Sequence, residues 1–200
     1  MTSLFNFGVL TLRDPLGAVQ RLRALNLSMG SRIMAVVLAA ALSTLLVILS
    51  NMLFPIEVTS PLSDAFERIM ARPLALASVQ AIGLVIAAWL MAVLGRLFGG
   101  KGQFGDALLV VVWIQIILIA VQVVQTAMML FFPMIGALLG LLIAGLLFYL
   151  PVRLAAALHG FSNLFLVFLG FVPAIFLLGM ILTPIASLFG VLPEIAPNDL

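Results

Sequence analysis

Residues 107–132 read ALLVVVWIQIILIAVQVVQTAMMLFF and contain no Lys, Arg, Asp or Glu. A bilayer core about 30 Å thick is crossed by ~20 helical residues that rise about 1.5 Å each. Because a segment surrounded by lipid has to satisfy its own backbone hydrogen bonds, helix is the expected conformation. This stretch therefore predicts a transmembrane helix, and it decides the class of the fold.

Four further uncharged apolar runs accompany this one, at 33–54, 73–95, 134–150 and 164–189. Pro133 separates the third run from the fourth so closely that the two should form a tight hairpin, while Pro151 and Gly160 bracket the fourth connection. Pro173 and Pro184 lie inside the last run and are expected to kink or divide it. The sequence thus predicts an all-α, polytopic integral membrane bundle of five transmembrane helices.

The overall composition agrees with lipid as the main solvent. Hydrophobic residues make up 65% of the 200 residues, charged residues only 8%, and the mean hydropathy is +1.37. A net charge of +2 is too small for a nucleic-acid-binding surface. The absence of cysteine excludes disulfides, thiolate metal sites and cysteine nucleophiles.

The distribution of Lys and Arg predicts the orientation in the membrane. The first connection carries only Arg68 and Arg72, and the third connection and the C-terminal tail carry none. The N-terminal segment and the second and fourth connections together carry seven: Arg13, Arg21, Arg23, Arg32, Arg96, Lys101 and Arg153. Since positive charge stays on the cytoplasmic side, we expect the N-terminus inside and the tail outside.

Three parts of the chain follow from these boundaries. Residues 1–32 form a cytoplasmic segment with a short interfacial helix, for which Asp14 and Pro15 supply the N-cap and first helical position. Residues 33–190 form the five-helix transmembrane domain, and residues 191–200 form a short non-cytoplasmic tail. The expected location is the bacterial cytoplasmic membrane.

The sequence offers little catalytic chemistry. The stretch from Gly95 to Gly102 has the glycines and lysine of a P-loop, but Gly102 stands where the magnesium-binding Ser or Thr belongs, and a membrane helix precedes it. His159 is the only histidine and is interpreted as a satisfied interfacial side chain. We therefore expect no catalytic residue, cofactor, metal or nucleotide, and no enzyme.

Glutamines mark one face of the third predicted span. Offsets of seven and three residues place Gln115, Gln122 and Gln125 near one side of a helix, which should point into the bundle. Buried amides usually join helices through bonds worth ~1 kcal/mol or less. The same face is also compatible with a polar conduction or ligand path.

Small residues recur four apart in the fourth predicted span, at Gly136, Gly140 and Ala144. This spacing lets helix backbones approach closely. The face could serve packing within the monomer or assembly with a partner.

The turn before the third span has the sequence GGKGQFGDAL at residues 99–108. It resembles the Yip domain family of Ypt/Rab-interacting membrane proteins, and in particular prokaryotic-type members, over roughly residues 10–190. Its glycine-rich turn with a basic residue comprises Gly99, Gly100, Lys101 and Gly102, and Phe104, Asp106 and Ala107 match the residues that lead into the third helix. The acidic-aromatic-Gly-Pro signature of eukaryotic members is missing. The resemblance implies a nonenzymatic protein of membrane organisation, trafficking or assembly.

These observations predict an integral membrane scaffold or accessory protein that acts through helix–helix contacts. Its expected partners are membrane lipids and other membrane protein subunits or further copies of itself. The alternative is a small transporter or channel that uses the glutamine-lined face of the third helix.

Overall fold

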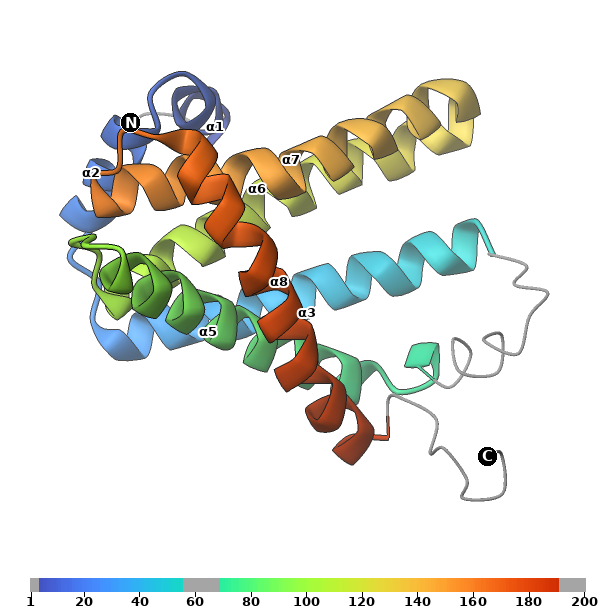
Figure 1. Cartoon of the computed structure of the whole chain (residues 1–200). Helices are drawn as coiled ribbons and strands as arrows, with labels where there is room; N and C mark the ends of the chain where they lie inside the picture. Colours follow the sequence, from blue (N-terminus) through green and yellow to red (C-terminus); the bar gives the residue numbers. More distant parts are fainter. Residues whose placement is uncertain (1–3, 56–68, 191–200) are drawn as a thin grey trace.

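The computed structural model describes residues 4–55 and 69–190, and the regular structure of these residues is helical (Figure 1). Five of the helices are long and apolar enough to cross a membrane: α3 (Met29–Leu53), α5 (Pro73–Leu97), α6 (Phe104–Phe131), α7 (Pro133–His159) and α8 (Leu164–Leu188). The predicted class and the five spans are confirmed. Arg68 and the predicted tail 191–200 lie outside the described residues, so the structure does not test them.

The prediction that residues 151–160 form a connection between helices is wrong. Helix α7 continues through Pro151 to His159, and Gly160, in the left-handed conformation with φ 76°, forms its C-cap. A proline inside a helix removes one backbone donor and crowds the carbonyl of the preceding turn, but packing can outweigh this cost. Here Leu154 and Leu158 are buried on the turns that follow the proline. Arg153 therefore belongs to a helix and not to a connection.

Of the two outcomes expected for Pro173 and Pro184, a kink or a division of the last span, the structure excludes the division. Helix α8 is continuous from Leu164 to Leu188 and includes both Pro173 and Pro184. Prolines are tolerated in membrane helices because local adjustments satisfy the carbonyls that they leave free. Asn163 caps the start of α8, where its side-chain oxygen accepts hydrogen bonds from the Phe165 and Leu166 amides.

Two short helices precede the first span. Helix α2 (Pro15–Ala24) begins as predicted, and the Asp14 carboxylate accepts a 2.9 Å hydrogen bond from the Gly17 amide. Helix α1 (Leu4–Arg13) was not predicted. It is held against α6 by a 2.9 Å hydrogen bond from Trp113 Nε1 to Thr11 Oγ1 and by ring contact between Phe7 and Trp113.

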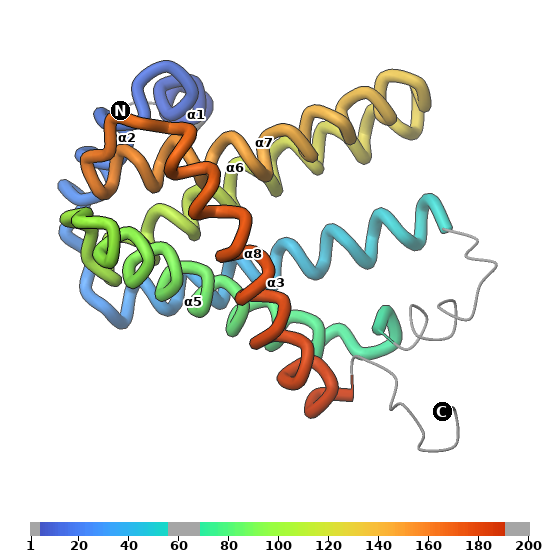
Figure 2. Tube along the Cα trace, viewed as in Figure 1, coloured from blue at the N-terminus to red at the C-terminus, as the bar shows by residue number. Residues whose placement is uncertain are grey.

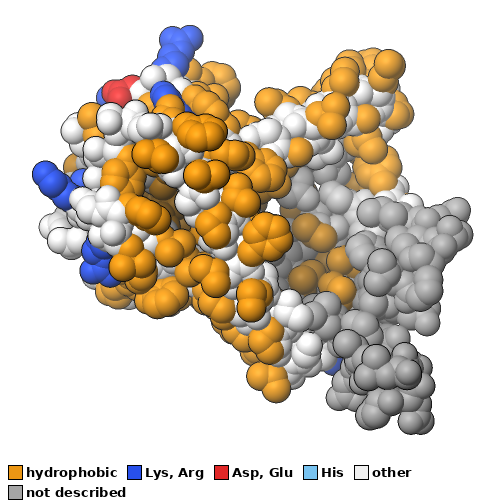
Figure 3. All heavy atoms as spheres, viewed as in Figure 1, with side chains coloured by type: hydrophobic (Ala, Val, Ile, Leu, Met, Phe, Trp, Pro, Cys, Tyr) orange, Lys and Arg blue, Asp and Glu red, His pale blue; other side chains and the backbone are white. Residues whose placement is uncertain are grey.

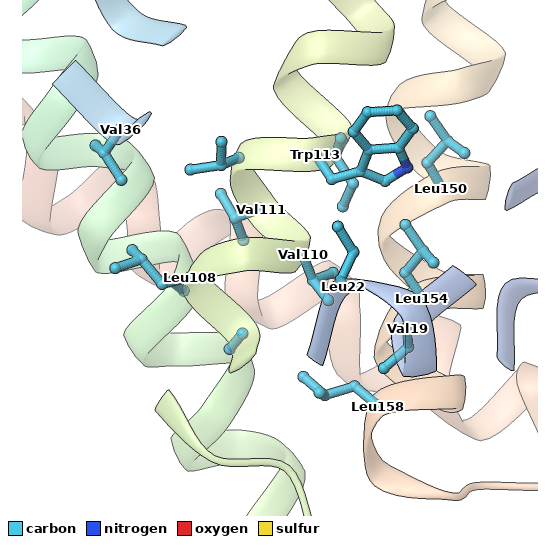
Figure 4. Close-up of a cluster of buried hydrophobic side chains, with 14 of the residues drawn as sticks. Val19, Leu22, Val36, Leu108, Val110, Val111, Trp113, Leu150, Leu154 and Leu158 are labelled. Atoms are coloured by element: carbon cyan, nitrogen blue, oxygen red, sulfur yellow. The ribbon is translucent and has the colours of Figure 1, made fainter. Parts of the chain in front are cut away.

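The core is centred on the first half of α6. Every residue from Ala107 to Ile114 is buried, so this part of α6 is covered on all sides. In Figure 4, Val19 and Leu22 of α2 lie beside Leu154 and Leu158 of α7 and beside Val110 of α6. The short helix α2 is therefore part of the same hydrophobic cluster as the spans.

The outer surface of the long helices is apolar, as expected for contact with lipid. In the most apolar stretch of α6, half of the residues are buried, whereas in that of α8 none is buried. Helix α8 runs obliquely across the bundle and contacts α5 and α7 (Figure 2). On the face drawn in Figure 3, apolar side chains cover the α6–α7 hairpin and α8. Lys and Arg gather mainly at the end that carries α1, α2 and the α5–α6 turn.

Gly136 sets the spacing of the α6–α7 hairpin. A Cβ atom there would lie 3.0 Å from Met129 Cα and 2.5 Å from Met129 Cγ. We expect Gly136→Leu to destabilise the protein by about 1–3 kcal/mol, because such overpacking forces the backbones apart. The thermal unfolding midpoint in detergent should fall. Gly145→Leu is the matched control on the same helix, since no atom lies within 4 Å of its added Cβ. Equal midpoints for the two variants would refute this role.

Candidate functional site

The side chain of His159 lies at the point where α5, α7 and the α5–α6 turn meet. It is the last residue of α7 and is only 3% exposed. Its ring stacks on Phe161 with the centroids 5.5 Å apart. The predicted satisfied histidine is thus found in the structure, although it is buried more deeply than an interfacial side chain.

Two hydrogen bonds fix the tautomer of this imidazole. The Gly102 amide donates to His159 Nδ1 at 3.2 Å, so Nδ1 is the unprotonated nitrogen. Nε2 then carries the proton and donates to the Met91 carbonyl of α5 at 3.1 Å. The backbone adds a third link, from the Lys101 amide to the His159 carbonyl at 3.4 Å. A proton added to Nδ1 would face the Gly102 donor, so the contact requires the neutral ring.

Three glycines surround the ring and leave room for it. A Cβ atom on Gly95 or Gly100 would overlap the imidazole, and one on Gly102 would lie 2.6 Å from its Cε1. We call Gly95, Gly100 and Gly102 together the histidine cradle. Gly99 has a different role, because its φ of 83° is a left-handed conformation that ends α5. The glycines that resemble a P-loop therefore pack against a side chain of the same protein.

Asp106 joins the start of α6 to two other segments. Its carboxylate accepts a 2.8 Å hydrogen bond from Arg23 Nε of α2, and Arg32 Nη1 of α3 lies 3.7 Å away. Arg23 also donates to the Leu158 carbonyl at 3.4 Å, next to the histidine cradle. The carboxylate lies in the first turn of α6, where the helix dipole favours negative charge.

The remaining residues of the family-like turn have separate positions. Lys101 is exposed, Phe104 is half-buried at the first position of α6 and packs against the core, and Ala107 is completely buried. Among residues 4–55 and 69–190, no group of three or more His, Asp or Glu is placed to hold a metal ion. The arrangement at this turn joins helices and exposes one lysine.

The glutamines of α6 do not share one set of neighbours. Gln115 donates to Ser43 Oγ of α3 at 3.0 Å, and Gln80 of α5 donates to the same oxygen at 2.8 Å. Gln125 lies instead against α7, where its Nε2 would be 2.9 Å from a Cβ on Gly140. Gln122 is half-buried, and its side-chain amide forms no hydrogen bond with another described residue. The polar contacts therefore point toward two different helices.

The small residues of α7 are likewise distributed between two environments. Gly136 is buried against α6, and Gly140 faces Gln125 of the same neighbour. Ala144 is exposed on the surface of the bundle. The first two of these residues pack within the monomer.

The contact between His159 and the histidine cradle can be tested by measuring the energetic coupling between His159 and Gly95. Gly95→Ala should lower the unfolding midpoint, because its methyl group would overlap the His159 ring. In a His159→Ala background the same change should cost little, which corresponds to a coupling of about 1–3 kcal/mol in a double-mutant cycle. Gly170→Ala is the control, since no atom lies within 4 Å of the added Cβ. If Gly95→Ala costs the same in both backgrounds, the cradle does not depend on the ring.

The chain was compared with known protein families, curated proteins and solved structures. The model of the Yip1 domain matches residues 9–190, which include all five candidate spans and the glycine-rich turn. No curated protein and no solved structure matches the chain. The match extends over nearly the whole sequence and agrees with the resemblance carried by residues 99–108. The chain belongs to the Yip1 domain family of polytopic membrane proteins.

Proposed function

We propose that this protein is a nonenzymatic integral membrane scaffold or accessory subunit that acts through helix–helix contacts. The observation that carries the proposal is the exposure of α8, in which Ala186 is the only buried residue. A helix that contributes so little to its own bundle is available to a neighbour in the membrane. Association between helices in lipid depends on close packing and polar contacts, which an exposed helix face can provide.

The absence of enzymatic activity is part of the same proposal. Among the described residues, His159 and Asp106 are two ionisable groups near the span ends whose side chains could take part in acid–base chemistry. His159 is enclosed by the histidine cradle, and Asp106 is paired with two arginines. Both groups have partners within the chain, which supports a structural role for each.

We place the α1, α2 and α5–α6 end of the bundle in the cytoplasm of a bacterial cell, with the protein in the cytoplasmic membrane. This orientation rests on the excess of Lys and Arg at that end. Because the chain lacks cysteine, single cysteines can be labelled without background. A cysteine at Gln103 should react only after the inner side is opened, and one at Ser63 should react in intact cells. The reverse pattern would contradict the orientation.

A small transporter or channel remains the second candidate. The buried Asn51 Oδ1 forms no hydrogen bond with the described residues and lies next in sequence to Ser50, which bonds Thr126 across α3 and α6 at 2.8 Å. The amides of Gln80 and Gln115, by contrast, already have partners on a neighbouring helix. A liposome flux that is lost in a Gln115→Leu, Gln122→Leu double variant would favour transport.

The scaffold proposal predicts a partner at defined stoichiometry. We expect mass spectrometry of the protein, purified in mild detergent from its own membrane, to find such a subunit. The double variant Phe176→Ala, Met180→Ala should reduce the bound partner severalfold, because both side chains are exposed on one face of α8. The matched control is Met34→Ala, Leu38→Ala, an equally spaced exposed pair on α3. Isolation of the chain without a partner, or equal loss from both variants, would contradict the proposal.

A further inference from the structure

A groove on the outside of the bundle runs between the second half of α7 and the start of α8. Seven of its lining residues are uncharged: Gly145, Phe148, Tyr149, Val152, Leu164, Phe165 and Phe168. The eighth is Arg153. We propose that this groove binds one anionic phospholipid, with the lipid phosphate at Arg153 and an acyl chain along the apolar wall.

The position of Arg153 along α7 places it at the level of lipid headgroups. It lies 20 residues beyond Pro133, which corresponds to about 30 Å of helix at ~1.5 Å per residue. This length equals the thickness of a bilayer core. The backbone of Arg153 is therefore about one core thickness along the helix from the α6–α7 turn, at the opposite membrane surface.

The charge of Arg153 has no anionic partner among the described residues. Its Nε atom is buried and forms no hydrogen bond there. Both ion pairs of the described residues involve Asp106 and a different arginine. The guanidinium lies over the ring of Tyr149, with its carbon 5.8 Å from the ring centroid. Because no carboxylate of the described residues neutralises this guanidinium, a phosphate oxygen beside it would be stabilised by a charge-assisted hydrogen bond.

The field at the mouth of the groove selects for negative charge. The first turn of α8 contributes Leu164 and Phe165 to the lining, so the positive end of that helix dipole lies at the same mouth as Arg153. None of the eight described residues that line the groove is Asp or Glu. The trimethylammonium group of phosphatidylcholine would be repelled here by Arg153 and by the positive end of the α8 dipole. The headgroup of phosphatidylglycerol has no positive charge and would not be repelled.

The apolar part of the groove has room for a hydrocarbon chain. Phe148 and Phe168 provide its wall, and Phe148 is held in an edge contact with Phe171 at 6.3 Å. Gly145 lies two helical turns deeper than Arg153, and no atom lies within 4 Å of a Cβ built on it. The open space at Gly145 is therefore continuous with the groove and lies on the side toward the bilayer centre.

Native mass spectrometry of the full chain tests the proposal. The detergent-solubilised protein is mixed with equal amounts of phosphatidylglycerol and phosphatidylcholine that have the same acyl chains. We expect the wild type to retain one phosphatidylglycerol in preference to phosphatidylcholine. Arg153→Gln should reduce this preference about fivefold, the size expected for one basic residue at a membrane surface. Gly145→Leu should reduce total lipid retention, since the leucine occupies the space for the acyl chain without changing any charge.

Arg21→Gln is the control for charge alone, because Arg21 is an exposed arginine of α2 outside the groove. Its lipid preference should equal that of the wild type. Gly145→Leu also serves if Arg153→Gln fails to fold, because its added side chain meets open space. An unchanged preference in Arg153→Gln, unchanged retention in Gly145→Leu, or the same loss in Arg21→Gln as in Arg153→Gln would overturn the proposal.

Discussion

The contact between one imidazole ring and three glycines holds together one end of this bundle. His159 occupies the space that side chains at Gly95, Gly100 and Gly102 would fill, and its two nitrogens bond the α5–α6 turn and the Met91 carbonyl of α5. The direction of each hydrogen bond allows only the Nε2–H tautomer. A side chain on any of the glycines, or a second proton on the ring, is incompatible with this arrangement.

Other features of the same end depend on that closure. With α5, α7 and the turn held together, residues 107–114 of α6 enter the centre of the bundle and are buried. Asp106 then lies where Arg23 of α2 and Arg32 of α3 can reach it. The glycine-rich turn that resembles the Yip family thus acquires a physical explanation, since its small residues accommodate a side chain from another helix. The lipid-facing side of α7 and α8 is left for contacts with lipid or a partner.

Much of the fold can be predicted from the sequence, because each membrane span requires a long uncharged apolar run and such runs are visible in the sequence itself. The N-cap at Asp14 is equally local, and its prediction was correct. The helices continue through Pro151, Pro173 and Pro184 for one reason that the sequence does not show locally, since the packing and lipid that keep a helix intact through proline are not encoded next to the proline. Helix α1 was missed because it depends on the distant pair of Thr11 and Trp113.

The site was less predictable than the fold. Sequence reasoning identified the glycines, Asp106 and His159 separately, but the contact between His159 and Gly102 joins residues 57 positions apart. No periodicity relates such positions. The glutamine face was expected only to point into the bundle, whereas α6 contacts α3 near Gln115 and α7 near Gln125. To predict which distant polar groups pair in a membrane bundle, one has to know which helices are adjacent.

The most direct test of this account is nitrogen NMR of the single histidine in ¹⁵N-labelled protein in lipid bicelles. Since His159 is the only imidazole in the chain, its signals need no assignment among residues. The account predicts one persistent tautomer with the proton on Nε2, and a scalar coupling across the hydrogen bond between the Gly102 amide nitrogen and Nδ1. A rapidly exchanging mixture of tautomers, or a proton on Nδ1, would show that the ring is not held by the turn and would contradict the account.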